Sequence, residues 1–100
     1  MRAGDKMKKA MAYDATEFLE TDEDIIAYLN AALDDGDPAL VSAALGDIAR
    51  ARGMTQLAKD TGITRDGLYK ALSPTGNPSF GTVQKVVKAL GYKLDVALPA

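Results

Sequence analysis

The chain has no cysteine, no histidine and no tryptophan. Without cysteine and histidine it lacks the usual ligands of a zinc site, and it has no thiol nucleophile. A Ser-His-Asp triad is also excluded, because no histidine is present to activate any of the three serines. The carboxylates occur in no paired arrangement beside a glycine-rich or metal-ligand pattern. We therefore predict a binding protein and not an enzyme, with no cofactor and no metal.

Long hydrophobic runs are absent too, and nothing approaches the ~18–20 apolar residues that a membrane span requires. Residues 1–12 are basic but have no apolar central run, so we expect a flexible leader and not a signal peptide. The lack of cysteine agrees with a cytoplasmic location. One hundred residues with 47% hydrophobic content are expected to form one globular domain.

Acidic and basic residues are separated along the chain. Residues 10–49 carry ten acidic residues and no basic one, whereas residues 50–93 carry eight basic and two acidic residues, a net charge of +6. This separation predicts two surfaces with different partners. For the acidic half alone, the alternative is that the carboxylates only keep a small protein soluble.

Capping and turn signals predict a series of helices. An acidic helical extension is expected over residues 13–36, where Thr21 and Asp24 have the spacing of a capping box. Asp37 and Pro38 predict the start of the next helix, which Gly53 ends. The last helix is expected between Ser79 and Gly91. The side chains expected to face inward are Ile25, Leu29, Ala32 and Leu33, with Tyr28 at the edge, and later Phe80, Val83, Val86, Val87 and Leu90.

Apolar and polar residues alternate over residues 92–98, which predicts one short β-strand. A single strand needs a partner for its backbone groups. Three partners remain open, namely residues 10–13 of the same chain, the same strand of a second subunit, and the sheet of another protein.

Residues 55–72 have the spacing of a helix-turn-helix DNA-binding motif. Ala58 is small enough for two helices to cross closely, and Gly62 allows the left-handed turn between them. Ile63 is expected to fill the corner, and Thr64 to cap the second helix through its hydroxyl group. The second helix, over residues 64–72, is expected to enter the major groove.

The outward residues of that second helix have predicted roles at DNA. Arg65 is expected to contact a guanine or a phosphate, and Lys70 a phosphate. Tyr69 is expected to contact a thymine methyl group or a phosphate, with packing beside Leu72 as the alternative. Asp66 is expected to pair with Arg65 or Lys70, which we prefer over a contact to cytosine.

Two helix starts are predicted phosphate clamps, one at Thr55 and Gln56 and the other at Asn77 and Ser79. Gly67 lies inside the second helix, where either a close approach to DNA or simple tolerance explains it. One such module contacts few base pairs. We therefore expect a homodimer on a palindrome whose half-sites lie about one helical turn apart.

Residues 53–80 resemble the addiction module antidote branch of the Xre-type, lambda-repressor-like proteins, which are HigA-like antitoxins. Residues 13–19, 24–29 and 46–54 also fit, so the resemblance covers residues 13–98. It implies an all-α, five-helix helix-turn-helix domain over residues 37–91 that binds its own operator. The family pattern assigns the DNA role to Thr55, Gln56, Thr64, Arg65, Asp66, Tyr69 and Lys70.

The resemblance also implies a partner, a small basic toxin of the RelE/ParE (HigB-like) class. It does not indicate the residues that hold the toxin. By charge complementarity, the candidates lie in the acidic segment, at Glu17, Glu20, Glu23 and Asp24. Two alternatives remain open: a solitary or phage-derived Xre-type regulator without a toxin, and a protein-interaction scaffold that does not bind DNA.

Overall fold

The computed structural model describes residues 15–99 as an all-α structure with five α-helices and no strand in that part of the chain. The leader expected over residues 1–12 lies outside the described residues. None of the described helices has the length and apolar content of a membrane span. The elements are a short 3₁₀ turn η1 (Ala15–Glu17), then α2 (Asp22–Asp35), α3 (Pro38–Arg52), α4 (Met54–Thr61), α5 (Arg65–Ala71) and α6 (Phe80–Ala89). The expectation of five helices within residues 37–91 is therefore wrong, because that range holds four, and the fifth, α2, belongs to the acidic extension.

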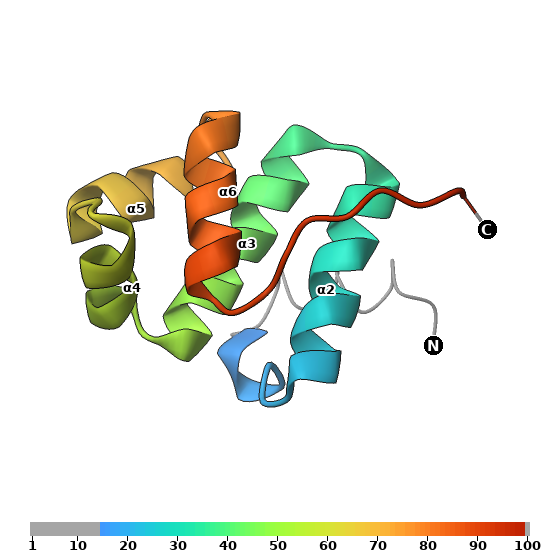
Figure 1. Cartoon of the computed structure of the whole chain (residues 1–100), viewed down its shortest axis with the longest axis horizontal. Coiled ribbons are helices and arrows are strands. Elements are labelled where there is room, and N and C mark those ends of the chain that lie inside the picture. Colours follow the sequence, from blue (N-terminus) through green and yellow to red (C-terminus); the bar gives the residue numbers. More distant parts are fainter. Residues whose placement is uncertain (1–14, 100) are drawn as a thin grey trace.

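Helix α3 is the centre of the arrangement, since it contacts η1, α2, α4 and α5. Figure 1 shows α4 and α5 at one end of the molecule and α2 at the other, with α3 and α6 between them. The last residues of the chain cross over α2 on their way to the carboxyl end. The molecule therefore has two distinct ends, one formed by α4 and α5 and one by α2 and the carboxyl-terminal segment.

The capping signals in the sequence are confirmed. Thr21 Oγ1 accepts a hydrogen bond from the Asp24 amide at 3.1 Å, and Asp24 Oδ2 accepts one from the Thr21 amide at 3.2 Å. Asp37 Oδ1 accepts from the Ala39 amide at 3.0 Å, and Ser79 Oγ from the Thr82 amide at 3.1 Å. These bonds satisfy amide groups that a helix leaves without partners in its first turn.

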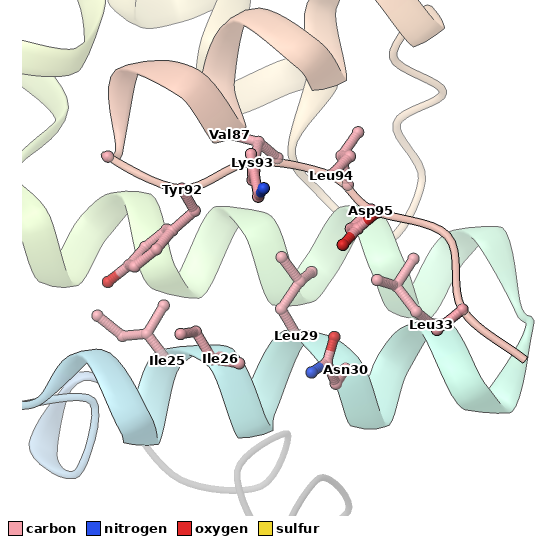
Figure 2. Close-up of a pocket in the computed structure, with 12 residues that line it drawn as sticks. Ile25, Ile26, Leu29, Asn30, Leu33, Val87, Tyr92, Lys93, Leu94 and Asp95 are labelled. Carbon is pink, nitrogen blue, oxygen red and sulfur yellow. The ribbon is translucent and has the colours of Figure 1, made fainter. Parts of the chain in front are cut away.

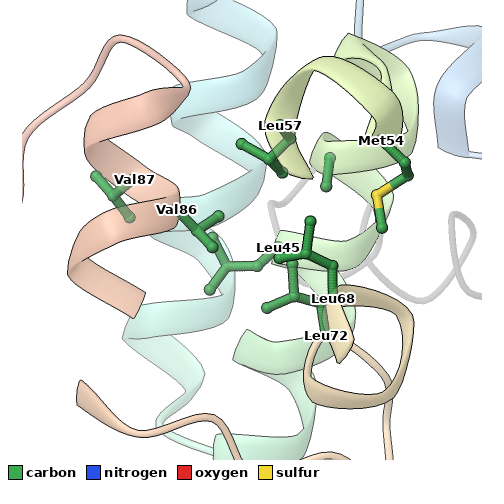
Figure 3. Packing of buried hydrophobic residues seen from close by; sticks show 8 residues of the cluster. Leu45, Met54, Leu57, Leu68, Leu72, Val86 and Val87 are labelled. Carbon is green, nitrogen blue, oxygen red and sulfur yellow. The ribbon is translucent and has the colours of Figure 1, made fainter. Parts of the chain in front are cut away.

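Two hydrophobic clusters lie along adjacent faces of α3, since Ala44 and Ile48 belong to the first and Leu45 and Ala49 to the second. The first lies between α2 and α3, and the second joins α3 to α4, α5 and α6 (Figure 3). Successive residues of α3 thus belong to different clusters, so this one helix contributes buried side chains to both parts of the hydrophobic core. The buried members of the second cluster are Leu45, Ala49, Met54, Leu57, Leu68, Leu72, Val86 and Val87.

Three expectations about the inward residues are wrong. Tyr28 is buried, with 1% of its surface exposed, whereas Leu33 is 45% exposed and Phe80 68% exposed. Tyr28 follows Ile25 by three residues and precedes Ala32 by four, so the three share one stripe of the helix. Leu33 lies about 100° further round. Phe80 is the first residue of α6, ahead of the part of that helix that packs.

Gly46 lies where α3 crosses the end of α5. A Cβ atom at this position would be 2.1 Å from the carbonyl oxygen of Leu72, which is far inside van der Waals contact. The absent side chain therefore allows the two backbones to approach closely, and this close approach determines how α5 is placed on the core.

The β-strand expected over residues 92–98 does not form in the described chain. Tyr92 turns its side chain toward the start of α2 and the end of α3, where its hydroxyl group donates to Asp22 Oδ1 at 2.7 Å. This contact directs the following residues across α2, where the neighbouring backbone is helical. No extended segment lies beside them in the described part of the chain to complete a ladder.

Candidate nucleic-acid interface

The turn between α4 and α5 is built as the sequence predicted. Gly62 has φ = 73°, in the left-handed region, and its amide donates to the Ala58 carbonyl at 3.0 Å. Thr64 Oγ1 accepts from the Gly67 amide at 3.0 Å and so begins α5. The turn sets α5 against α4 in a fixed orientation, with Ile63 packed against the second cluster.

Thr61 supports the same turn, a role that the sequence analysis missed. Its hydroxyl group donates to the Leu57 carbonyl at 2.8 Å and accepts from the Ile63 amide at 3.2 Å. One side chain thus closes the end of α4 and holds the corner residue. The signal was present in the sequence, since threonine before glycine at a helix end can make these local bonds.

Helix α5 has one strongly buried side chain, Leu68, with 0% exposure. Arg65, Asp66, Tyr69 and Lys70 are all exposed. Because an α-helix turns about 100° per residue, Asp66 and Lys70 lie nearly opposite Leu68. Arg65 and Tyr69 form a neighbouring stripe. The outer surface of α5 is therefore polar and carries both of its cationic side chains.

Asp66 does not make the ion pair that the sequence analysis expected. No ion pair joins Asp66 to Arg65 or Lys70 within residues 15–99, so the expected pairing is not formed. The guanidinium carbon of Arg65 instead lies 6.0 Å from the centre of the Tyr69 ring, at the outer limit of a cation–π contact. Arg65 and Tyr69 thus present one combined cationic and aromatic surface.

Gly67 is tightly packed from within the motif. A Cβ atom here would lie 3.0 Å from Thr64 Oγ1 and 3.2 Å from Ile63 Cγ2. Close packing of the turn thus offers an intramolecular reason for glycine here, which the sequence analysis did not consider.

The two predicted phosphate clamps lie at helix starts. Thr55 and Gln56 are exposed in the first turn of α4, and Gln56 Nε2 donates to Asp60 Oδ1 at 2.8 Å. Asn77 and Ser79 are exposed before α6, where the Ser79 hydroxyl group also contacts Thr82 Oγ1 at 3.0 Å. Gln56 and Ser79 therefore already have partners within the chain.

The acidic candidates lie at the start of α2 and just before it. Glu17, Glu20 and Glu23 are exposed. Asp24 is half-buried, and its carboxylate serves the capping box with Thr21. Three of the four carboxylates are thus presented to solvent, whereas the fourth has a structural contact.

Two arginines of the basic half form ion pairs with carboxylates of the same chain. Arg50 donates to Asp47, which also accepts from the Tyr28 hydroxyl group at 2.6 Å. Arg52 Nη2 lies 2.6 Å from both Asp22 Oδ1 and the Tyr92 hydroxyl oxygen. These two arginines therefore contribute less to a DNA-binding surface than their charge suggests.

The Asp22–Arg52–Tyr92 contact joins residues that lie far apart in the sequence, and the sequence analysis missed it. Hydrogen bonds from Tyr92 and Arg52 lower the pKa of the Asp22 carboxyl group. Burial and the hydrogen bond to Asp22 raise the pKa of Tyr92. The contact holds the start of the carboxyl-terminal segment against α2 and α3.

A family model described as "probable addiction module antidote protein" matches residues 9–98. An uncharacterized protein of Haemophilus influenzae is 55% identical over 84 residues, which cover 84% of this chain and 87% of that protein. No solved structure matches the chain. The matched range contains every described helix, including both the acidic segment and the α4–α5 pair.

Proposed function

This chain belongs to the family of probable addiction module antidote proteins, and on that premise we propose that it is the antitoxin of a type II toxin–antitoxin module. An antidote acts by binding, which agrees with the sequence's lack of catalytic groups. In this proposal the chain neutralises a small basic toxin of the RelE/ParE (HigB-like) class. It also binds its own operator DNA and represses its operon.

The surface of α5 is the observation that carries the DNA-binding half of the proposal. Helix α5 buries Leu68, whereas its charged and aromatic side chains are exposed. The turn at Gly62 holds this helix against α4. A lambda-repressor-like, Xre-type motif places its second helix in the major groove with the first turn deepest. Arg65 and Asp66 belong to that first turn, and Lys70 to the last.

In this assignment Arg65 contacts base edges or a phosphate, with Tyr69 beside it. Lys70 contacts a phosphate. Thr55 at the start of α4 and Thr64 at the start of α5 lie near the sugar–phosphate backbone of the DNA. Lys59 is a further exposed cation, on α4. Gln56, Asn77 and Ser79 complete the proposed phosphate contacts, and Asp66 would face the groove without an internal partner. The domain over residues 37–91 would act as one half of a homodimer.

The acidic segment over residues 13–36 supports the toxin-binding half. Glu17, Glu20 and Glu23 are exposed carboxylates, and the sequence has no basic residue between positions 10 and 49 to neutralise them. A basic toxin would be attracted to this surface and oriented by it. Asp24 also adds negative charge there, although its carboxylate has a capping role.

Two alanine substitutions test the DNA contacts. Arg65→Ala should reduce operator affinity by about 1–3 kcal/mol and relax the sequence preference, whereas Lys70→Ala should weaken all sequences alike. Fluorescence anisotropy on the operator and on a scrambled duplex separates the two effects. Leu33→Ser, which changes an exposed residue of α2 at the opposite end of the molecule, is the control. Unchanged operator affinity in Arg65→Ala would show that α5 presents a different side to DNA.

Charge reversal tests the acidic surface. The triple change Glu17→Lys, Glu20→Lys and Glu23→Lys should weaken toxin binding, and the matching glutamine variant should weaken it less, because it only removes the attraction. Asp24 is left unchanged because its replacement would break the capping box. Binding is measured by calorimetry, with operator binding as the folding control. The probe is the proposed toxin, sought as a small basic protein encoded by a gene next to that of this chain. Equal toxin affinity in all three proteins would exclude this surface.

A further inference from the structure

A groove of about 650 Å³ runs between α2 and the carboxyl-terminal segment. Figure 2 shows Leu29 and Leu33 extending from α2 toward the segment, which crosses above the helix with Lys93, Leu94 and Asp95. The walls are mostly apolar, although Lys93 and Asp95 line the segment side. Such a groove can receive the apolar side chains of another chain segment.

Exposed hydrophobic side chains are concentrated at this end of the molecule. Among the described residues seven large hydrophobic side chains are exposed, and five of them belong to α2 or the carboxyl-terminal segment. We name these five the α2–tail surface: Ile26 (46% exposed), Leu33 (45%), Leu94 (38%), Val96 (95%) and Leu98 (95%). Ile26, Leu33 and Leu94 line the groove, whereas Val96 and Leu98 are exposed residues of the tail outside its lining. An apolar concentration of this kind marks an interaction site in a small protein.

The amides beside this surface also lack backbone partners within residues 15–99. After Tyr92, whose amide donates to the Val87 carbonyl at 3.1 Å, no amide of residues 93–98 donates to a backbone carbonyl. Val96 donates only to the Asp95 side chain, at 2.9 Å. The segment thus presents apolar side chains and unpaired backbone groups together, a combination that a bound chain can satisfy.

The charge around the groove indicates the chemistry of its occupant. Helix α2 contains five acidic residues and no basic one. Glu23 and the pair Asp34 and Asp35 flank its exposed apolar residues at the two ends, and Lys93 is the cation among the groove-lining residues. A complementary occupant therefore carries apolar side chains with lysine or arginine at its edges. A second copy placed on the same face would bring these carboxylates against their own equivalents.

The position of the surface is also unsuited to an operator-bound dimer interface. It lies at the end of the molecule opposite α4 and α5 (Figure 1), and the longest extent of the chain is 36 Å. Two copies joined end to end at this surface would hold their α5 helices further apart than the ~34 Å between half-sites one helical turn apart. An occupant of another kind would leave α5 accessible.

We infer that the α2–tail surface is where the antitoxin holds its toxin, through an apolar toxin segment flanked by cationic side chains. The inference rests on the proposed function and adds to it the apolar part of the interface. The acidic residues before and within α2 then orient the toxin by charge attraction. The α2–tail surface provides the apolar area that toxin binding removes from water. Toxin binding and DNA binding occupy opposite ends of the chain.

Substitution of the exposed apolar residues tests this inference. Ile26→Ser with Leu33→Ser should weaken binding of the small basic protein encoded beside the chain at least tenfold in calorimetry, and so should Val96→Ser with Leu98→Ser. The second pair is almost fully exposed, so its replacement leaves the fold intact. Phe80→Ser is the matched control, since it removes a similarly exposed side chain from another part of the molecule. Operator affinity should be unchanged in both double variants.

Four results would overturn the inference. If the parent chain binds the toxin and the Ile26→Ser, Leu33→Ser variant binds it equally well, the groove is not the docking site, although the proposed function stands. The Val96→Ser, Leu98→Ser variant gives the same test for the exposed tail residues outside the groove. If the parent chain binds no such toxin, both proposals fail. If light scattering shows a parent dimer that the variants lose, the surface joins two copies. If the substitutions destabilise the chain only when residues 1–12 are present, the occupant is the chain's own amino-terminal segment.

Discussion

Single residues determine how closely the helices approach, and Gly46 is the clearest case. Gly46→Ala should lower the free energy of unfolding by about 1–3 kcal/mol, because the added methyl group meets the Leu72 carbonyl oxygen and must displace α5. Gly81→Ala is the matched control. Its Cβ would have only an ordinary contact of 3.8 Å to Ser79 Oγ, and alanine favours the helix. Urea denaturation of both variants gives the comparison, and equal stability would contradict the close crossing.

Tyr28 is a second residue with a measurable role. Burial, followed by the hydrogen bond to Asp47, raises the pKa of its hydroxyl group above the usual value of 10.0. The neutral phenol is therefore favoured in the folded state. This preference for the neutral phenol stabilises the folded protein fully below pH 10. The stabilisation is lost as the pH rises from there toward the higher pKa that Tyr28 has in the folded protein.

Tyr28→Phe should thus cost about 0.5–1.5 kcal/mol at neutral pH and reduce the loss of stability above pH ~10. Tyr92, whose pKa is also raised, keeps part of that dependence. Urea denaturation at a series of alkaline pH values measures both quantities. If the variant loses stability with pH as steeply as the parent, ionisation of Tyr28 is not the cause of that loss.

At the scale of the element, the length of a helix determines how much it depends on its cap. Helix α5 has 7 residues, whereas α2 has 14, and each begins at a threonine whose hydroxyl group accepts an amide hydrogen bond. Since short helices are costly to nucleate, the shorter helix should depend more strongly on its cap. Thr64→Ala and Thr21→Ala should each cost about 0.5–2 kcal/mol.

Amide hydrogen exchange distinguishes the two capping variants. Thr64→Ala should accelerate exchange throughout α5, whereas Thr21→Ala should affect only the first turn of α2. Since α5 is the proposed recognition helix, Thr64→Ala should also weaken operator binding. Exchange that increases equally in both helices would show that the cap does not limit the order of α5.

Elements with local signals were predictable from the sequence, and those that depend on distant contacts were not. Thr21, Asp37, Gly62 and Thr64 each act on residues within four positions, so their roles follow from spacing alone. The carboxyl-terminal segment alternates like a strand, but the contact of Tyr92 with Asp22 and Arg52 determines its course. That contact spans 70 residues from Asp22 and leaves no trace in the local pattern. Gly46 was likewise unpredictable, because its crossing partner lies 26 residues away.

At the scale of the whole molecule, the separation of charge along the sequence becomes a separation in space. The proposed DNA-binding residues of α4 and α5 lie at one end, and the acidic helix α2 lies at the other (Figure 1). The contact between Asp22 and Arg52 joins the acidic and basic parts of the sequence. In the proposed function, a chain with a formal net charge of −2 thus attracts DNA at one end and a basic protein at the other.

Duplex affinity as a function of salt concentration tests the central claim most directly. Fluorescence anisotropy with the chain's own promoter DNA should show an affinity that falls steeply and log-linearly as the salt concentration rises. The reason is that lysine and arginine side chains of the bound protein displace counterions from the DNA phosphates. Lys70→Ala should reduce the slope by about 1. Affinity that is absent at low salt, or that does not change with salt, would contradict the assignment of α4 and α5 as the DNA-binding end.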